Sequence, residues 1–168
     1  KTIPAVVTDN HLGGKLAIEH LVGLGHKRIT YCFSDETQSR YNGCVEAAKQ
    51  KKIESPRLCA TEKELISLLK SNKRPTAVVA FSDIDAIRVK HAAERTGLSI
   101  PQDLSITGFD NIWLASLQEF SLTTIKQSQR EIGRLAMELL LKRMNGENVK
   151  SRLVTPELII RKSTTTLK

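Results

Sequence analysis

The sequence predicts an α/β fold built on a parallel sheet. Short apolar segments of strand length alternate with amphipathic segments of about 10 to 15 residues that carry apolar side chains at helical spacing. The segment 76–81 (TAVVAF) is a continuous apolar run, as expected for a strand that is covered on both faces. At 168 residues, the chain is long enough for one domain, or two small lobes, around a sizeable core.

The first two strand–helix pairs lie before residue 53. Strands are expected at 3–8 and 28–33, where apolar residues run for strand length. The helix between them ends at Gly25, a residue that suits the position after a helix. Its apolar face comprises Leu12, Leu16, Ala17, Leu21 and Leu24. A polar loop, 34–39, leads to a second helix whose apolar side comprises Tyr41, Cys44, Val45 and Ala48.

The next two pairs are expected in the middle of the chain. A weak strand (58–60) precedes Thr61-Glu-Lys-Glu64, a capping box in which the hydroxyl and the later carboxylate satisfy free N–H groups at a helix start. The buried stripe of that helix comprises Leu65, Leu68 and Leu69. The apolar strand described above is followed by Ser82-Asp83, which begins a helix that ends at Gly97.

The segment 97–127 is the one around which the rest of the sequence is organised. It predicts a short buried strand, 104–107, and then a turn formed by Gly108-Phe-Asp-Asn111. A second strand, 122–125, follows after an excursion of about ten residues. Open parallel sheets bind ligands outside the carboxyl ends of their strands, so the acid in this turn suits a ligand contact as well as a turn.

The last part of the chain predicts a strongly amphipathic helix and an edge strand. Ser128-Gln-Arg-Glu131 forms a second capping box, and Gly146 suits the helix end. The apolar stripe of this helix comprises Ile132, Leu135, Ala136, Leu139, Leu140 and Met144. The final strand is expected at about 153–161, where Pro156 restricts it to a sheet edge or a bulge.

The net charge of +8 raises the question of a nucleic-acid partner. Basic residues cluster at Lys49–Lys52 and Lys70–Arg74, where helices should end, and cations are favourable at helix C-termini. Attraction to a polyanion at low salt stays open. Direct DNA reading by this chain is not expected, because the sequence has no helix-turn-helix, zinc finger or aromatic RNA platform. No apolar run approaches the roughly 18 residues of a membrane helix, and nothing resembles a signal peptide.

The three cysteines, Cys32, Cys44 and Cys59, are expected to be reduced thiols. They are odd in number and have no CxxC spacing, and Cys32 and Cys44 fall within apolar patterns. Neither a disulfide nor a metal site is expected, and reduced core thiols favour a cytoplasmic protein.

Polar groups follow three strands of the predicted sheet. Arg40 comes one loop after the second strand, Ser82-Asp83 directly follow the fourth, and Asp110 lies in the turn after the fifth. In a right-handed parallel sheet these strand ends share one edge, so the side chains are expected to converge on one crevice. Guanidinium donors and carboxylate acceptors together match the hydroxyls of a neutral polyol such as a sugar.

Each of these residues also has a purely structural interpretation. Asp83 suits the N-cap of its helix, and Arg40 would form a salt bridge with Asp9 or Asp110. Trp113 would either give a sugar ring an apolar wall or pack beneath its own loop.

Enzyme chemistry is not expected. The chain has no GxSxG, GxxxxGK[ST], GxGxxG or HExxH motif. His20 and His26 have the wrong spacing for one helix face, so buried or boundary histidines are favoured over metal ligands. Asp83 and Asp110 would suit glycoside chemistry only with one raised pKa in a closed cleft, of which the sequence gives no sign.

Six segments, which run in order through nearly the whole chain, together resemble the lactose-repressor (LacI/GalR) family of bacterial transcription regulators. They are VVTDNHLGGKLAIEHLVGLGHKRI (6–29), RYNG (40–43), PTAVVAFSDIDAI (75–87), GLSIPQDLSITGFDN (97–111), SLTTIKQSQREIGRLAMELLLKR (121–143) and LIIRKST (158–164). The resemblance implies no cofactor and no metal.

The resemblance implies the periplasmic-binding-protein-like type I fold, in which a ligand lies between two three-layer α/β lobes. Residues 1–10 and 127–148 would be remnants of the amino-terminal lobe, and 11–126 and 149–168 would form the carboxy-terminal lobe. The three crossovers between the lobes would fall near Asn10, Gln127 and Val149. The chain would then be a fragment, and the last helix would expose the apolar stripe that a complete lobe covers.

The resemblance also assigns effector contacts by position. The residues that would contact or flank the effector are Arg40, Ser82, Asp110, Gln127, Asp9, Val79 and Phe81. Of these, Asp9 matches a family acid near the hinge, while Val79 and Phe81 would lie beside the pocket. Two departures bear on the identity of the effector: Ser82 stands where the family often has Asn, and loop 34–39 lacks the usual glycine.

The function implied is that of the effector-binding and dimerisation region of a LacI-type transcriptional repressor that responds to a sugar or a related small metabolite. Homodimers would form through 83–96 and 112–118, with DNA bound only through a helix-turn-helix that this chain does not contain, and without a membrane partner. Two alternatives remain: a transport-linked periplasmic sugar-binding protein, and an enzyme acting on a phosphorylated or glycosidic sugar.

Overall fold

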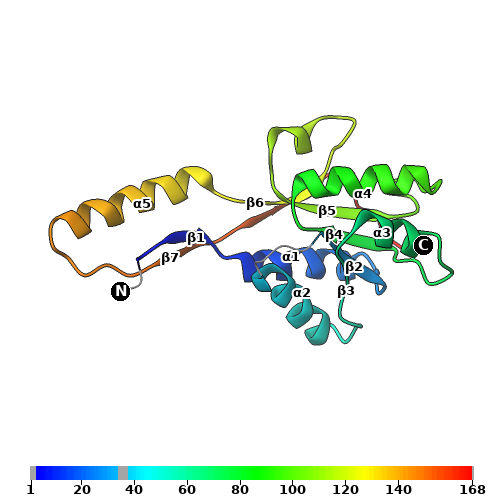
Figure 1. Cartoon of the computed structure of the whole chain (residues 1–168), viewed down its shortest axis with the longest axis horizontal. Coiled ribbons are helices and arrows are strands. Elements are labelled where there is room, and N and C mark those ends of the chain that lie inside the picture. The colour runs from blue at the N-terminus through cyan, green and yellow to red at the C-terminus, as the bar shows by residue number, and fades with distance from the viewer. Residues whose placement is uncertain (1–2, 34–37, 168) are drawn as a thin grey trace.

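The body of the protein is a six-stranded sheet with the spatial order β3-β2-β4-β5-β6-β8 (Figure 1). The computed structural model describes residues 3–33 and 38–167. The strands of this sheet are β2 (Ile29–Cys32), β3 (Arg57–Cys59), β4 (Ala77–Ala80), β5 (Ser105–Asp110), β6 (Thr123–Lys126) and β8 (Glu157–Ile159). All neighbouring pairs are parallel except β6 and β8. The predicted parallel α/β fold is therefore confirmed.

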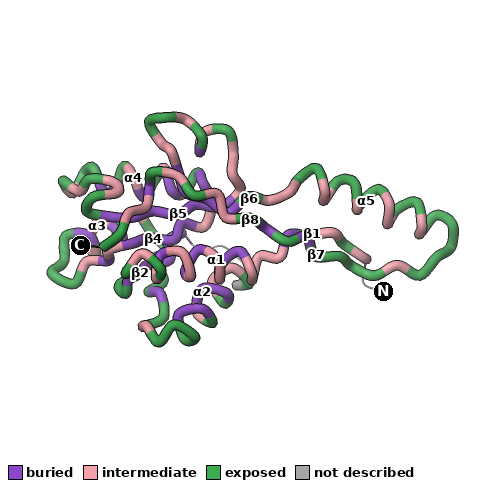
Figure 2. The backbone as a smooth tube through the Cα atoms, turned by 180° about the vertical axis from the view of Figure 1, so that it is seen from behind, coloured by how far each residue is buried: buried purple, intermediate pink, exposed green. Residues whose placement is uncertain are grey.

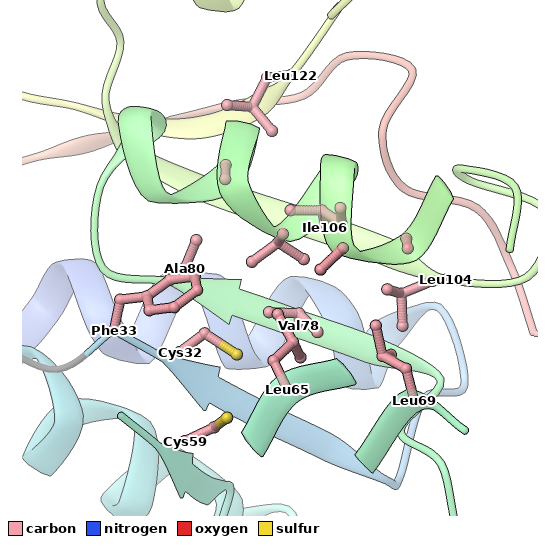
Figure 3. Close-up of a cluster of buried hydrophobic side chains, with 14 of the residues drawn as sticks. Cys32, Phe33, Cys59, Leu65, Leu69, Val78, Ala80, Leu104, Ile106 and Leu122 are labelled. Atoms are coloured by element: carbon pink, nitrogen blue, oxygen red, sulfur yellow. The ribbon is translucent and has the colours of Figure 1, made fainter. Parts of the chain in front are cut away.

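Two helical layers cover the sheet, one on each face. Helices α1 (Asn10–Gly23) and α2 (Gln38–Gln50) pack on one face, and α3 (Glu62–Leu69) and α4 (Asp83–Arg95) on the other. Figure 3 shows this side of the core, where Leu65 lies beside Val78, Leu69 lies beside Leu104, and Ile106 lies closer to α4. The buried backbone in Figure 2 runs along the central strands β4 and β5, whose residue patterns are almost fully buried. The three-layer prediction is confirmed.

A separate arm extends from one end of the body (Figures 1 and 2). It consists of α5 (Gln129–Met144) and a two-stranded parallel sheet of β1 (Val6–Thr8) and β7 (Arg152–Val154). No residue of α5 is buried, and Met144 is 73% exposed, so the predicted uncovered apolar stripe is confirmed. Within the described residues, no helix is long and apolar enough to cross a membrane.

The chain leaves the arm later than the sequence predicts. The final strand, expected as one element at 153–161, is two strands in different sheets, separated by Thr155 and Pro156, which belong to neither strand. β7 pairs with β1 in the arm and β8 pairs with β6 in the body. The capping box predicted at the start of α5 is also wrong, since the Ser128 side chain makes no cap hydrogen bond. The box that starts α3 at Thr61 is confirmed.

The strand that carries the candidate acid is longer than predicted. β5 continues through Gly108 and Phe109 to Asp110, where the turn was expected to have begun already. The reversal of the chain falls instead on Asp110 and Asn111, which have φ angles of 109° and 54°. Asp and Asn adopt this left-handed region more readily than other residues with a side chain. The Asp110 side chain therefore emerges directly from a strand end.

The backbones of α1 and α2 are in direct contact through two glycines. A Cβ atom on Gly14 would collide with the carbonyl oxygen of Arg40, and one on Gly43 would collide with the carbonyl oxygen of His11. The Cys44 thiol also donates a hydrogen bond to the Gly14 carbonyl oxygen at 3.3 Å. The absence of side chains at these two positions thus brings the start of α2 against α1.

Adding a methyl group at this contact should be costly, whereas the same change elsewhere should not. We expect Gly43→Ala to lower the free energy of unfolding by about 1–3 kcal/mol, because the rigid backbones must separate. Gly133→Ala on α5, where a Cβ meets nothing within 4 Å, should raise it by about 0.5–1 kcal/mol through the better helix propensity of alanine. Urea unfolding measures both values. Equal shifts of the same sign in the two variants would contradict a close helix contact.

Candidate functional site

Arg40, Asp110 and Gln127 meet at the carboxyl edge of the sheet, and we refer to them as the carboxyl-edge cluster. Asp110 ends β5, Gln127 directly follows β6, and Arg40 lies in the first turn of α2. Nη2 of Arg40 lies 4.0 Å from Oδ1 of Asp110, and the same oxygen accepts a hydrogen bond from Nε2 of Gln127 at 2.5 Å. Three of the four residues predicted to contact the ligand are therefore brought together.

The Arg40 guanidinium is held in one orientation by contacts on several sides. Its Nε donates to Oδ1 of Asn10 at 2.7 Å, and its Nη1 donates to the carbonyl oxygen of Phe81, also at 2.7 Å. The guanidinium carbon lies 3.6 Å from the centroid of the Phe109 ring and 4.5 Å from that of Phe81. Such stacking and hydrogen bonding leave arginine little rotamer freedom. Arg40 is thus a pre-positioned cation that faces the Asp110 carboxylate.

Asp110 keeps one carboxylate oxygen available. Oδ1 is engaged by Gln127 and Arg40, while none of the described residues forms a hydrogen bond with Oδ2. Its side chain is 28% exposed. Burial raises the pKa of Asp110 above its ordinary value, and the Gln127 hydrogen bond and the Arg40 charge oppose that rise. A carboxylate with an unused oxygen at a partly exposed strand end can accept a hydrogen bond from a ligand hydroxyl.

Asp83 is a buried anchor, and its predicted interpretations as a helix N-cap or a ligand contact are both wrong. It is only 1% exposed, and Ser82 supplies the cap of α4 instead. Its Oδ1 accepts from the Thr124 hydroxyl at 2.5 Å, and its Oδ2 accepts from the backbone N–H of Ile112 at 2.8 Å. Asp83 therefore ties α4 to β6 and to the segment that follows Asp110.

The packing around Asp83 explains why glycine precedes Phe109. A Cβ atom on Gly108 would collide with Oδ1 of Asp83. Burial raises the pKa of Asp83 to about 6, against the opposing hydrogen bonds from Thr124 and Ile112. On the far side of the turn, Oδ1 of Asn111 accepts a hydrogen bond from Nη2 of Arg161 at 2.7 Å. Asp110 and Asn111, the two residues with left-handed backbone angles, are thus flanked by the hydrogen bonds of Asp83 on one side and of Arg161 on the other.

Four other predicted site residues, Ser82, Asp9, Val79 and Phe81, are not part of the carboxyl-edge cluster and make other contacts. The Ser82 hydroxyl donates to Oδ2 of Asp85 at 2.7 Å and accepts from the Asp85 N–H at 3.1 Å. Asp9 is the N-cap of α1. Val79 is buried in the core cluster that Phe81 covers in part. Contact of these four side chains with an effector stays a prediction, as does the effect of the glycine-free loop, of which residues 34–37 lie outside the described residues.

Trp113 does not pack beneath its loop, contrary to one of the two expectations. It begins the short 3-10 helix η1 (Trp113–Ser116) and is 71% exposed. Ile84, on the first turn of α4, is 52% exposed. Since Asp83 accepts a hydrogen bond from the N–H of Ile112, the segment that carries Trp113 is tied to the first turn of α4.

The histidines and cysteines take structural positions. His20 Nε2 lies 2.9 Å from the Thr164 hydroxyl, and His26 lies within 3.0 Å of the Thr76 hydroxyl and the Thr165 carbonyl oxygen. Burial lowers the pKa of both histidines. All three cysteines are free and buried. The described part of the chain holds no group of three or more His, Cys, Asp or Glu residues that could bind a metal ion.

Sequence reasoning did not assign site roles to the residues that support the cluster. Asn10 holds Arg40, and the Thr8 hydroxyl donates to Oε1 of Gln127 at 2.7 Å. Thr124 holds Asp83 from 41 positions away. Of these supporting residues, only Phe109 could have been identified from the sequence. Successive side chains of a strand point to opposite faces of the sheet, so an aromatic residue between Gly108 and Asp110 would lie on the opposite face from Asp110.

Comparison with family models matches residues 18–164 to a periplasmic binding protein-like domain. The HTH-type transcriptional repressor CytR of Escherichia coli (strain K12) is 40% identical, over 98% of this chain and 53% of its own. The arabinose metabolism transcriptional repressor of Geobacillus stearothermophilus is 34% identical, over 96% of this chain and 50% of its own. The chain thus spans about half the length of these curated relatives.

Solved structures with this fold include a periplasmic binding protein/LacI transcriptional regulator from Alkaliphilus metalliredigens complexed with D-xylulofuranose. It is similar to this chain with a TM-score of 0.82 and 30% sequence identity. The match covers 96% of this chain and 66% of that one.

The raised pKa of Asp83 predicts a specific pH dependence of stability. The pKa of about 6 in the folded protein lies above the ordinary value of 3.8, so folding favours the protonated form. Its contribution is complete below about pH 4, and about 3 kcal/mol is lost as the pH rises through about 6. Asp83→Asn cannot titrate, so the difference in unfolding free energy between the two proteins should change by that amount across this window.

Urea unfolding of both proteins at about pH 4 and about pH 7 measures this difference. Asp103→Asn is the matched control, because Asp103 is an exposed acid that pairs with Arg74 away from the cluster and exposed charges contribute little. A difference for Asp83→Asn that stays constant with pH would show that Asp83 is not an isolated buried acid.

Proposed function

We propose a function that starts from family membership: the chain belongs to the family of periplasmic binding protein-like domains, in its LacI-type form. The function is that of the effector-binding and dimerisation region of a LacI-type transcriptional regulator. The curated relatives described above are repressors, which are regulators and not enzymes. In such a regulator the effector binds two lobe arrangements unequally and changes operator affinity, a coupling of about 1–3 kcal/mol.

The observation that carries the proposal is the carboxyl-edge cluster. A fixed cation and a carboxylate with an unused oxygen form a small polar site beside the Phe81 ring. A sugar presents hydroxyls to the polar groups and C–H bonds to the aromatic face. Such a mixed site therefore suits a neutral polyol better than a charged or wholly apolar ligand.

The effector class we propose is a pentose or a molecule that contains one. One matched structure was solved with D-xylulofuranose, and one relative is named for arabinose metabolism, and both sugars are pentoses. The vicinal hydroxyls of a furanose ring would bind to Oδ2 of Asp110 and to the Arg40 guanidinium.

A hydrogen-bond chain links the cluster to the arm and supports a role in allosteric coupling. Asp110 accepts from Gln127, whose Oε1 accepts from Thr8 at the end of β1. Gln127 and Thr8 lie on two of the three segments that connect body and arm. We place lobe crossovers at these two positions and a third between Val154 and Glu157, later than Val149, because β7 still pairs with β1. Ligand contact at Asp110 would then bias the connections between the lobes.

The dimer would form through α4 and the segment 112–118, where Ile84 and Trp113 are exposed. Exposed aromatic and aliphatic side chains of this kind are typical interface anchors.

Operator binding would come from a helix-turn-helix outside this chain, and the regulator would act in the cytoplasm. A transport-linked periplasmic sugar-binding protein is the second candidate, favoured by the periplasmic binding protein-like domain match. Operator binding by the longer protein would distinguish the regulator from the transporter.

Replacing Asp110 should weaken sugar binding without unfolding the chain. Asp110→Asn keeps the shape of the side chain and tolerates a φ of 109°, but it loses the charged acceptor. We expect affinity to fall by about tenfold to a hundredfold, as is typical for a lost hydrogen bond to a charged group. Isothermal titration with D-ribose, L-arabinose and D-xylulose measures it, with Asp103→Asn as the control variant.

The outcomes of this titration separate two claims. Unchanged affinity of Asp110→Asn for a pentose that the wild-type chain binds would remove Asp110 from the site. Absence of heat with all three sugars in the wild-type chain would reject a free pentose as the effector.

Removing the exposed apolar side chains should weaken self-association. We expect the double variant Ile84→Ser/Trp113→Ser to raise the dimer dissociation constant by about tenfold or more, as for interface anchors. Sedimentation velocity across a concentration series measures this constant. Met137→Ser on α5 is the control, since Met137 is also a large hydrophobic residue and is 56% exposed. Dissociation caused by the control alone would place the interface on the arm.

A further inference from the structure

Basic residues that are scattered in the sequence converge on one groove at the amino edge of the sheet. The groove has a volume of about 1070 Å³ and lies where α1, α2 and α3 end and where β2, β3 and β4 begin. Its cations are Lys27, Arg28, Lys51, Lys52, Arg57 and Lys73. Among the described residues that line it, Glu54 is the single acid. The two basic clusters noted in the sequence both contribute to this amino-edge groove.

These cations are unpaired, unlike many others on the described surface. Within residues 3–33 and 38–167, the side chains of the four lysines and of Arg57 form no hydrogen bond or ion pair, and the Arg28 side chain donates only to the carbonyl oxygen of Arg74 at 3.1 Å. Outside the groove, several arginines have acidic partners. Examples are Arg88 with Asp85 at 2.8 Å, Arg95 with Glu62 at 2.6 Å and Arg134 with Glu131 at 2.7 Å. The groove therefore concentrates positive charge that the body does not neutralise.

Helix ends explain only part of this charge. The partial negative charge at the C-termini of α2 and α3 favours nearby cations such as Lys51 and Lys73. Arg57, however, begins a strand, and Lys27 and Arg28 precede another. Several like charges around one groove repel one another and attract a complementary anion from a distance.

The residues at the floor of the groove indicate which kind of anionic partner would fit it. Between the cations it is lined by the apolar side chains of Val22, Ile53 and Leu68, which are partly buried, and by Pro75. A bare phosphate chain would use only the cations. A polypeptide segment with both carboxylates and apolar side chains would use the rim and the floor together.

We propose that the amino-edge groove binds an acidic segment of another protein, one that carries apolar residues between its carboxylates. The groove and the carboxyl-edge cluster lie at opposite edges of the same sheet, so effector and protein partner can be bound together. This proposal does not depend on the identity of the effector.

Fluorescence anisotropy with a short labelled peptide of Glu and Leu residues tests the proposal on the whole chain. We expect saturable binding that weakens as salt is raised. The double variant Lys27→Glu/Lys51→Glu should bind about tenfold more weakly. The control Arg143→Glu/Lys150→Glu changes the net charge equally at exposed positions of the arm and should leave the affinity nearly unchanged. Urea unfolding of both variants checks that the body stays folded.

Three results would overturn the proposal. Equal weakening in the two double variants would mean attraction by net charge alone. Equal binding of a Glu-only peptide would mean that the apolar floor is not used. Tighter binding of a DNA duplex than of the peptide, lost in the same groove variant, would identify a phosphate-binding surface instead of a protein-binding one.

Discussion

The contact between α1 and α2 is the constraint on which the candidate site depends. Because Gly14 and Gly43 have no side chains, the two helix backbones are in contact. The Arg40 backbone therefore lies beside the first turn of α1. There Asn10 fixes its Nε atom, and the rings of Phe109 and Phe81 hold its guanidinium plane. A helix pair separated by even one methyl group would move this cation relative to the sheet edge. The packing of α1 against α2 therefore determines where the Arg40 charge lies.

A second constraint is the buried Asp83 carboxylate, which lies next to the Asp110–Asn111 turn. Asp83 is buried and has a pKa of about 6, which is an unfavourable place for a carboxylate. Its two oxygens hold Thr124 and Ile112, and the Thr124 hydroxyl also accepts a hydrogen bond from the N–H of Asn111 at 3.4 Å. The left-handed residues Asp110 and Asn111 can then keep their backbone angles. Asp110 in turn is linked to the arm through Gln127 and Thr8, so hydrogen bonds connect the carboxyl edge of the sheet to the arm.

Periodicity and strand-end logic predicted the parallel sheet, the three layers and the shared edge of Arg40 and Asp110, because each rests on local pattern plus the handedness of parallel connections. The glycine contact was not predicted, since close backbone approach has no periodic signature. Asp83 was misassigned because its partners lie 29 and 41 residues away. The end of β5 was placed too early, since a Gly-Phe-Asp-Asn run resembles a turn although three of its residues still belong to the strand.

The two edges of the sheet differ in chemistry. The carboxyl edge has a paired cation and acid that suit a small neutral ligand, whereas the amino edge has unpaired cations over an apolar floor. A crystal structure of the chain soaked with a pentose would test most directly whether the carboxyl edge is the effector site. The account predicts a sugar hydroxyl within hydrogen-bond distance of Oδ2 of Asp110 and another beside the Arg40 guanidinium. A sugar bound elsewhere, with Asp110 and Arg40 still contacting only protein, would contradict it.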